Sequence, residues 1–246
     1  METDTQGLAL PELRAQALAA LCCPDIERTR ELANALHAAA AQLPLDAEAL
    51  LTPPTASTLP GRPQRPRLVM PKQVAQRSRF TLEGRAALIH AICHIEFNAI
   101  NLALDAVWRF DAMPARFYID WLQVANEEAL HFALLREHLL ELGFDYGDFD
   151  AHEGLWLMTQ RTADDVLARM ALVPRTLEAR GLDATPPLQA KFERAGDARA
   201  VEILAIILRD EIGHVAIGNR WYRWLCEQRG LDPVHHYCVL AARHQA

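Results

Sequence analysis

Hydrophobic residues recur along most of the chain at spacings of three and four, which is the period of an amphipathic α-helix, and no segment alternates as a strand does. Thr81 precedes one long periodic segment as an N-cap, and Gly143 follows the end of another. The sequence therefore predicts an all-α four-helix bundle. Its four long helices are expected over 81–108, 114–142, 163–180 and 198–229.

Shorter helical segments surround these four. Two Ala/Leu-rich helices are expected first, then a turn and a short helix bounded by Pro186-Pro187, and a last helix in the tail; these segments are 8–22, 25–43, 155–159, 187–195 and 232–246. Residues 44–71 are rich in proline and lack periodicity, which predicts an extended connector. The predicted parts are an N-terminal helical appendage over 1–43, a proline-rich basic connector over 44–80 and the bundle over 81–246.

The charge is uneven along the chain. The net charge is −7, which argues against a nucleic-acid partner. Residues 62–85 nevertheless hold seven basic residues and one acid. We favour a solvated linker for this stretch, with a patch for an anionic substrate or partner as the alternative.

Several features favour a cytoplasmic protein without a membrane span. No run of 18 uncharged apolar residues occurs, and the first sixteen residues are acidic and lack the layout of a signal peptide. The five cysteines are odd in number and form no Cys-x-x-Cys pair, so we expect no disulfide framework.

Two Glu-x-x-His motifs carry the candidate chemistry: Glu128 with His131, and Glu211 with His214. Residues three apart share a helix face, so each motif presents a carboxylate and an imidazole together. Both motifs lie on apolar stripes, where a carboxylate is costly unless it is neutralised, paired or bound to a metal. The stripe residues include Trp121, Val124, Phe132 and Leu135 around the first motif, and Leu204, Ile207, Leu208 and Val215 around the second.

Two further acids, Glu96 and Glu178, lie on apolar stripes of the other two long helices. Glu128 follows Glu96 by 32 residues, and Glu211 follows Glu178 by 33. A helical hairpin that carries Glu and then Glu-x-x-His thus occurs twice. Two single glutamates and two Glu-x-x-His motifs are the ligand set of ferritin-like di-iron and di-manganese proteins.

The predicted cofactor is therefore a pair of iron ions, with manganese or a mixed pair as the alternative. Four carboxylates balance the charge of two divalent cations. In such sites Glu128 and Glu211 would bridge the metals. The terminal ligands would be Glu96, Glu178, His131 and His214.

Neighbouring residues are candidates to support these ligands. Asp210 and Glu127 each precede a motif glutamate and could accept the free N–H of a ligand histidine, although a plain surface acid is an equal alternative. Arg180 could pair with one of these acids. His90 and His94, four residues apart, are interpreted as a packed or hydrogen-bonded pair, because His94 faces away from Glu96 on the helix.

The stretches HAICHIEFNAINLALDAVWRF, VANEEALHFALLREHLLELGFDYGDFDAHEGLW, RTLEARGLD and LRDEIGHVAIGNRWY resemble a bacterial ferritin-like family of unknown function. The resemblance covers most of residues 80–240 and includes all six candidate ligands. The wider superfamily, which includes the MiaE-type tRNA hydroxylases, implies dioxygen chemistry at a di-iron site. Glu127 departs from the Asp that is common in that position.

The leading hypothesis is a di-iron oxidoreductase that activates dioxygen to hydroxylate or oxidise an organic substrate. The alternatives are a ferroxidase or iron-handling protein, a metal-free helical adaptor, and a tRNA-modifying hydroxylase. The expected partners are a small-molecule substrate and dioxygen. An electron-donor protein and a second copy of the chain are further candidates.

Overall fold

The structure, a computed structural model, describes residues 12–75 and 77–245, without the side chains of residues 177 and 178. Within these residues the chain forms helices and an isolated β-bridge but no strand, so the predicted all-α class is confirmed. The predicted helix over 8–22 begins outside the described residues. The elements are α1 (Leu13–Leu21), α2 (Ile26–Ala39), η1 (Pro71–Gln73), α3 (Leu82–Arg109), α4 (Ala115–Glu141), α5 (Gly154–Arg161), α6 (Val166–Leu172), η2 (Val173–Glu178), α7 (Ala179–Arg194), α8 (Ala198–Gln228) and α9 (Pro233–His244).

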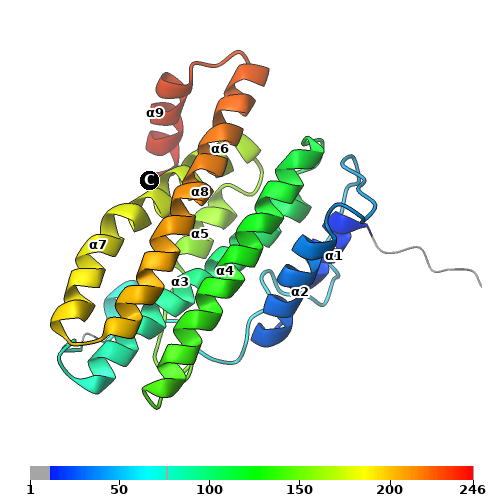
Figure 1. Cartoon of the computed structure of the whole chain (residues 1–246). Helices are drawn as coiled ribbons and strands as arrows, with labels where there is room; N and C mark the ends of the chain where they lie inside the picture. Colours follow the sequence, from blue (N-terminus) through cyan, green and yellow to red (C-terminus); the bar gives the residue numbers. More distant parts are fainter. Residues whose placement is uncertain (1–11, 76, 246) are drawn as a thin grey trace, which may run out of the picture.

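The main body is a bundle of two helical hairpins (Figure 1). α3 and α4 pack along each other, and α8 packs against the continuous run of α6, η2 and α7. Contacts between α4 and α8 join the hairpins. The buried faces of these helices meet at the centre of the bundle, where the two Glu-x-x-His motifs lie.

Local sequence signals set the ends of these helices. The side chain of Thr81 accepts a hydrogen bond from the backbone N–H of Gly84 and so caps α3, as predicted. Gly143 has a positive φ of 85° directly after α4. The backbone N–H of Phe144 then donates to the carbonyl of Leu139 at 3.0 Å, which closes the last turn.

The second hairpin differs from the prediction. A helix end before Gly181 and a separate helix over 187–195 were expected, but α7 runs without a break from Ala179 to Arg194 and contains Pro186 and Pro187. The prediction was wrong because α7 lies at the surface of the bundle, where water can satisfy the carbonyls that the prolines leave unpaired. Packing of Thr185 and Phe192 in the core holds the helix together across this point.

A π-helical turn, η2, joins α6 to α7. Pro174 lies in this turn and has no N–H to donate, which favours a change of helical register there. Pro174 packs against Gly218 of α8, where an added Cβ would lie 2.5 Å from the Cβ of the proline. The absence of a side chain at Gly218 therefore permits the close approach of η2 to α8.

The N-terminal pair packs directly on the bundle, α1 against α3 and α2 against α4, and shares one continuous core with it. Arg14 of α1 is 1% exposed. It donates to the carbonyls of Val107 and Trp108 at the end of α3 and to connector carbonyls of Asp46, Ala47 and Ala49. This one side chain thus joins α1, α3 and the connector.

The connector crosses the surface and pairs its charges with the loop after α4. Val69 donates its backbone N–H to Ala151, and Ala151 donates to Arg67. Three connector arginines form ion pairs with acids of this loop: Arg62 with Glu153, Arg65 with Asp148 and Arg67 with Asp150. Much of the positive charge of 62–85 is therefore balanced within the chain.

Helix α3 is long and apolar enough to cross a membrane by length and composition, with a mean hydropathy of 1.4 over its most apolar window. That window is 78% buried inside the structure. Such burial is typical of a core helix of a bundle.

Candidate metal centre

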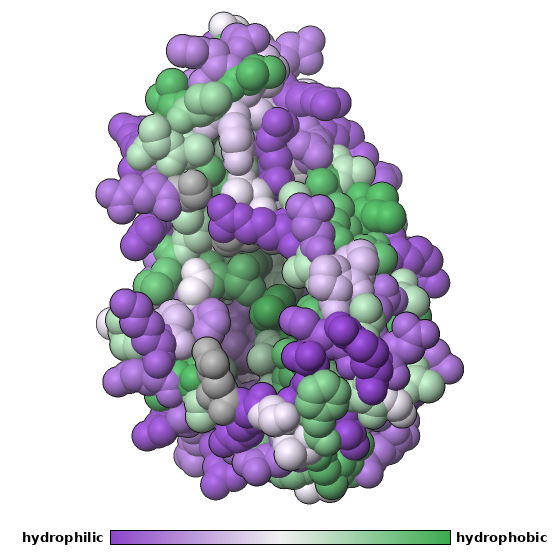
Figure 2. Space-filling model, turned by 90° about the vertical axis from the view of Figure 1, so that its left-hand side faces the viewer, coloured by the Kyte–Doolittle hydropathy of each residue, from purple (hydrophilic) through white to green (hydrophobic). Residues whose placement is uncertain are grey.

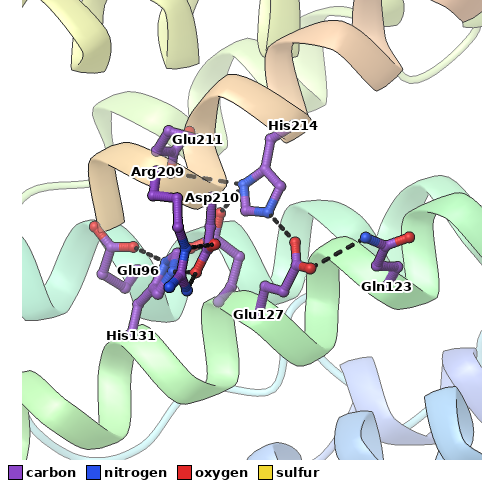
Figure 3. Close-up of polar contacts among 9 residues, drawn as sticks. Glu96, Gln123, Glu127, His131, Arg209, Asp210, Glu211 and His214 are labelled. Carbon is purple, nitrogen blue, oxygen red and sulfur yellow. Dashed lines mark hydrogen bonds and ion pairs between the residues drawn. The ribbon is translucent and has the colours of Figure 1, made fainter. Parts of the chain in front are cut away.

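The two Glu-x-x-His motifs meet in the interior of the bundle, between α4 and α8 (Figure 3). Glu128 lies between the two imidazoles: its Oε2 is 3.3 Å from Nδ1 of His131, and its Oε1 is 3.1 Å from Nδ1 of His214. Both histidines and Glu128 are fully buried. The geometry places Glu128 where one carboxylate could contact two ions.

Two other carboxylates complete the cluster. Oε2 of Glu96, from α3, lies 3.2 Å from Nδ1 of His131, and Oε1 of Glu211 lies 3.7 Å from Nδ1 of His214. One potential ligand atom from each of Glu96, Glu128, His131 and Glu211 lies within 4.8 Å of the others. This buried group could hold a metal ion.

Several buried atoms of the cluster lack a well-formed hydrogen bond to a described residue. Glu128 Oε1, Glu211 Oε2 and His214 Nδ1 are buried without a hydrogen bond among the described residues, although Nδ1 and Oε1 are only 3.1 Å apart. A buried polar atom without a partner costs about 1–3 kcal/mol. Since all three belong to one cluster of carboxylate and imidazole donors, the site fits a metal ion that would satisfy them together.

The outer nitrogen of each histidine contacts an acid of the opposite helix. Nε2 of His131, on α4, lies 3.1 Å from Asp210 of α8. Nε2 of His214, on α8, lies 2.7 Å from Glu127 of α4. Both contacts leave Nδ1 as the nitrogen that faces the cluster, as a ligand histidine requires.

The electrostatics of the cluster are dominated by buried negative charge. Burial, and then repulsion by Glu128, raises the pKa of Glu96 well above its usual range, and the same two causes raise the pKa of Glu211. Burial opposes charge on His131, but the adjacent carboxylates Glu128 and Glu96 outweigh it and raise its pKa to about 11. Without a cation, the cluster therefore holds protons that neutralise its charge, and a metal would replace them.

Two residues predicted for the site, Glu178 and Arg180, lie at the junction of η2 and α7. The side chain of Glu178 lies outside the described part of the chain, and its backbone lies at the end of η2, one turn before Gly181. Arg180 is exposed, and the guanidinium that pairs with Asp210 is that of Arg209, at 2.8 Å.

Sequence reasoning missed two polar residues next to the cluster. Gln123 donates to Glu127 at 3.1 Å, and Arg209 contacts both oxygens of Asp210 (Figure 3). The sequence could have indicated both residues, because Gln123 precedes Glu127 by one helical turn and Arg209 is adjacent to Asp210.

A pocket of about 130 Å³ adjoins the cluster, with Glu96 and Glu211 in its wall. The remaining lining is mainly apolar and comes from α3, α5, α7 and α8. Figure 2 shows a hollow with hydrophobic residues in its depth on the face that lies to the left in Figure 1, the side of α7.

The other histidine pair behaves as expected. His94 lies 2.8 Å from the hydroxyl of Tyr146, and Nε2 of His90 accepts a hydrogen bond from the backbone N–H of Gly147. Both side chains are buried. Each histidine is packed and hydrogen-bonded, as expected, and the partners are Tyr146 for His94 and Gly147 for His90.

The fold and the cluster together define an all-α bundle protein with a buried carboxylate–histidine group that could hold a metal. The chain belongs to the family described as "Protein of unknown function (DUF455)", whose model matches residues 22–246. An "Uncharacterized protein" of Haemophilus influenzae is 57% identical over 190 residues, which is 74% of this chain and 66% of that relative. The match thus spans slightly less than two thirds of the relative's length. No solved structure matches the chain.

Proposed function

We propose that the chain binds two iron ions at this cluster and is an oxidoreductase that uses dioxygen to oxidise an organic substrate. The observation that carries the proposal is the placement of Glu128 between His131 and His214, with one oxygen near each Nδ1. A carboxylate in this position suits a bridge between two ions. Glu96 and Glu211 supply further oxygens, and Glu178 is the fourth carboxylate that the sequence predicts for this site.

The donor set favours iron or manganese. Carboxylates and imidazoles are ligands for Fe(II) and Mn(II), whereas Cu(I) favours thiolates and thioethers. The same combination of two single glutamates and two Glu-x-x-His motifs is used by ferritin-like di-iron proteins. When bound, an iron pair would supply the activation of dioxygen, which carboxylates and imidazoles do not perform alone.

The protein's own residues would prepare the site. Asp210 and Glu127 accept the Nε2 protons of His131 and His214, which holds Nδ1 of each ring toward the cluster. Burial of Glu128 and both histidines excludes bulk water and strengthens each electrostatic contact. The apolar pocket beside Glu96 and Glu211 gives an organic molecule access to the site.

This pocket favours oxidation of an organic substrate over ferroxidase activity, since an apolar wall offers few ligands to an entering iron ion. The ion pairs between the connector and the loop after α4 weigh against a tRNA substrate, because they reduce the charge available to phosphates. An electron-donor protein would complete the reaction where the substrate itself supplies too few electrons.

Elemental analysis tests the metal proposal. The wild-type chain, loaded anaerobically with Fe(II), is expected to hold two irons, and Glu128→Gln is expected to hold at most one. Glu137→Gln is the matched control, because Glu137 lies on the same helix but is exposed. Equal iron content in wild type and Glu128→Gln would refute the metal centre.

Oxygen uptake tests the redox proposal separately. The Fe(II)-loaded wild type and Glu137→Gln are expected to consume dioxygen in an oxygen electrode with a chemical reductant, and Glu128→Gln is not. Iron binding without oxygen consumption would retain the metal centre and reject the oxidoreductase.

A further inference from the structure

The pocket beside the cluster has walls that restrict what it can bind. Its lining includes aliphatic side chains from three helices: Ile92, Ala99 and Leu102 of α3, Leu188 of α7, and Leu204 and Ile207 of α8. Thr185, which donates its hydroxyl to the carbonyl of Gly181, has already used its donor. The lining therefore offers few free hydrogen-bond donors to a ligand.

Among the side chains that the structure describes, the charged groups in the wall are Glu96 and Glu211, and no basic residue lines the pocket. An anionic ligand would meet two carboxylates and no compensating cation. Once metal ions neutralise these carboxylates, the pocket also has no net negative charge to attract a cation. The wall thus selects against both signs of charge.

The size of the pocket sets a second limit. Its volume is about 130 Å³, and an apolar cavity of about 150 Å³ can take one benzene molecule. We propose, on the basis of the proposed metal centre, that this pocket is the substrate site and that it takes an uncharged apolar group no larger than a single aromatic ring. The group would lie against Glu96 and Glu211, next to the reacting centre.

Gly181 offers a way to close the pocket without disturbing the fold. It lines the pocket, and a Cβ added at this position would meet no atom of the described side chains within 4 Å. Replacing a helical glycine also raises helix propensity by up to about 1 kcal/mol. Gly181→Leu should therefore fill the pocket in a folded protein, and Gly181→Met is a second, more flexible plug.

Binding of fluorobenzene, followed by ¹⁹F NMR, tests the proposal in the metal-free and the anaerobic Fe(II)-loaded full chain. The wild type is expected to bind the probe, and both Gly181 variants are expected to bind it at least tenfold more weakly. Ala190→Leu is the matched control, since Ala190 is exposed on the opposite face of α7 and does not line the pocket. In the Fe(II)-loaded wild type, bound iron should also speed the relaxation of the fluorine nucleus.

The outcomes distinguish a failure of the proposed pocket from a failure of the proposed metal centre. Equal binding by wild type and Gly181→Leu, with both folded by circular dichroism, would overturn the proposed site. Tighter binding of benzoate or benzylammonium to the Fe(II)-loaded protein than of fluorobenzene would overturn the uncharged class. Fluorobenzene binding that is sensitive to Gly181→Leu, in a chain that loads no iron, would support the apolar pocket and reject the proposed function instead.

Discussion

The carboxylate of Glu127 on α4 lies 2.7 Å from Nε2 of His214 on α8, so it supports the histidine of the other motif and not its own. Asp210 on α8 makes the reverse contact to His131 on α4. Each helix therefore contributes one imidazole to the cluster and one acid that orients the opposite imidazole. This exchange couples the α4–α8 contact to the geometry of the centre.

Glu127→Gln is predicted to weaken metal binding without removing a ligand. Glutamine can still accept a hydrogen bond from His214, but it lacks the negative charge that increases the basicity of the ring. Loss of such a partner lowers metal affinity by about 10- to 100-fold. Competition titration with a chelator measures the change. Glu137→Gln, exposed on the same helix, should match the wild type, and an unchanged affinity in Glu127→Gln would contradict the role.

Two glycines of α8 are predicted to respond in opposite directions to alanine. A Cβ at Gly218 would lie 2.5 Å from Pro174 of η2, whereas a Cβ at Gly213 would meet nothing within 4 Å. Gly218→Ala should therefore destabilise the fold by about 1–3 kcal/mol through overpacking. Gly213→Ala should raise stability by up to about 1 kcal/mol through helix propensity. Urea unfolding of both variants measures the two effects; equal stabilities would show that η2 adjusts freely.

Much of the bundle and the cluster could be predicted because both depend on local spacing. Glu128 and His131 share a helix face whatever surrounds them, and the apolar stripe around them implies burial. The convergence of Glu96 with both motifs also followed from one inward carboxylate per helix. The exchange of supporting acids could not be predicted, because it depends on the rotation of α4 relative to α8.

The errors in the second hairpin have a different origin. Pro186-Pro187 and Gly181 are strong local signals against a helix, yet α7 continues through them. Tertiary packing on α8 outweighed local propensity there. The residues that line the pocket could not be predicted for a related reason: Gly181 and Ile92 line it together although they lie on separate helices far apart in sequence.

His90 is predicted to make the fold sensitive to acid. Burial lowers its pKa from 6.5 to about 4, despite the attraction of Asp148 and Asp145. Below pH 6.5 the unfolded chain gains a proton at this position that the folded chain gains only near pH 4, so stability falls as the pH drops through this window. The loss from this group is at most about 3.5 kcal/mol, from about 1.4 kcal/mol per pKa unit.

Chemical denaturation at pH 7 and pH 4.5 measures this effect. His90→Gln can keep an acceptor for the N–H of Gly147 and should lose less stability between the two pH values than the wild type. His152→Gln is the control for replacing a histidine by glutamine, because His152 is exposed. An identical pH dependence in the wild type and His90→Gln would exclude His90 as the cause.

Among the polar side chains outside the cluster, Arg14 is predicted to contribute most to the stability of the N-terminal pair, α1 and α2. Its guanidinium donates to five backbone carbonyls at the end of α3 and in the connector, and it lies 5.4 Å from the ring centroid of Tyr118. Arg14→Met retains much of the packing but leaves buried carbonyls without donors, so unfolding should require at least about 3 kcal/mol less free energy. Arg28→Met, exposed on α2, should change stability by no more than about 0.5 kcal/mol. Urea unfolding measures the free energy of unfolding of both variants.

Hydrogen exchange locates any loss of stability in Arg14→Met. Early exchange of the amide hydrogens of α1 and α2, while those of α3 and α4 stay protected, would show that Arg14 holds the appendage and not the bundle. Similar stabilities for Arg14→Met and Arg28→Met would contradict the prediction.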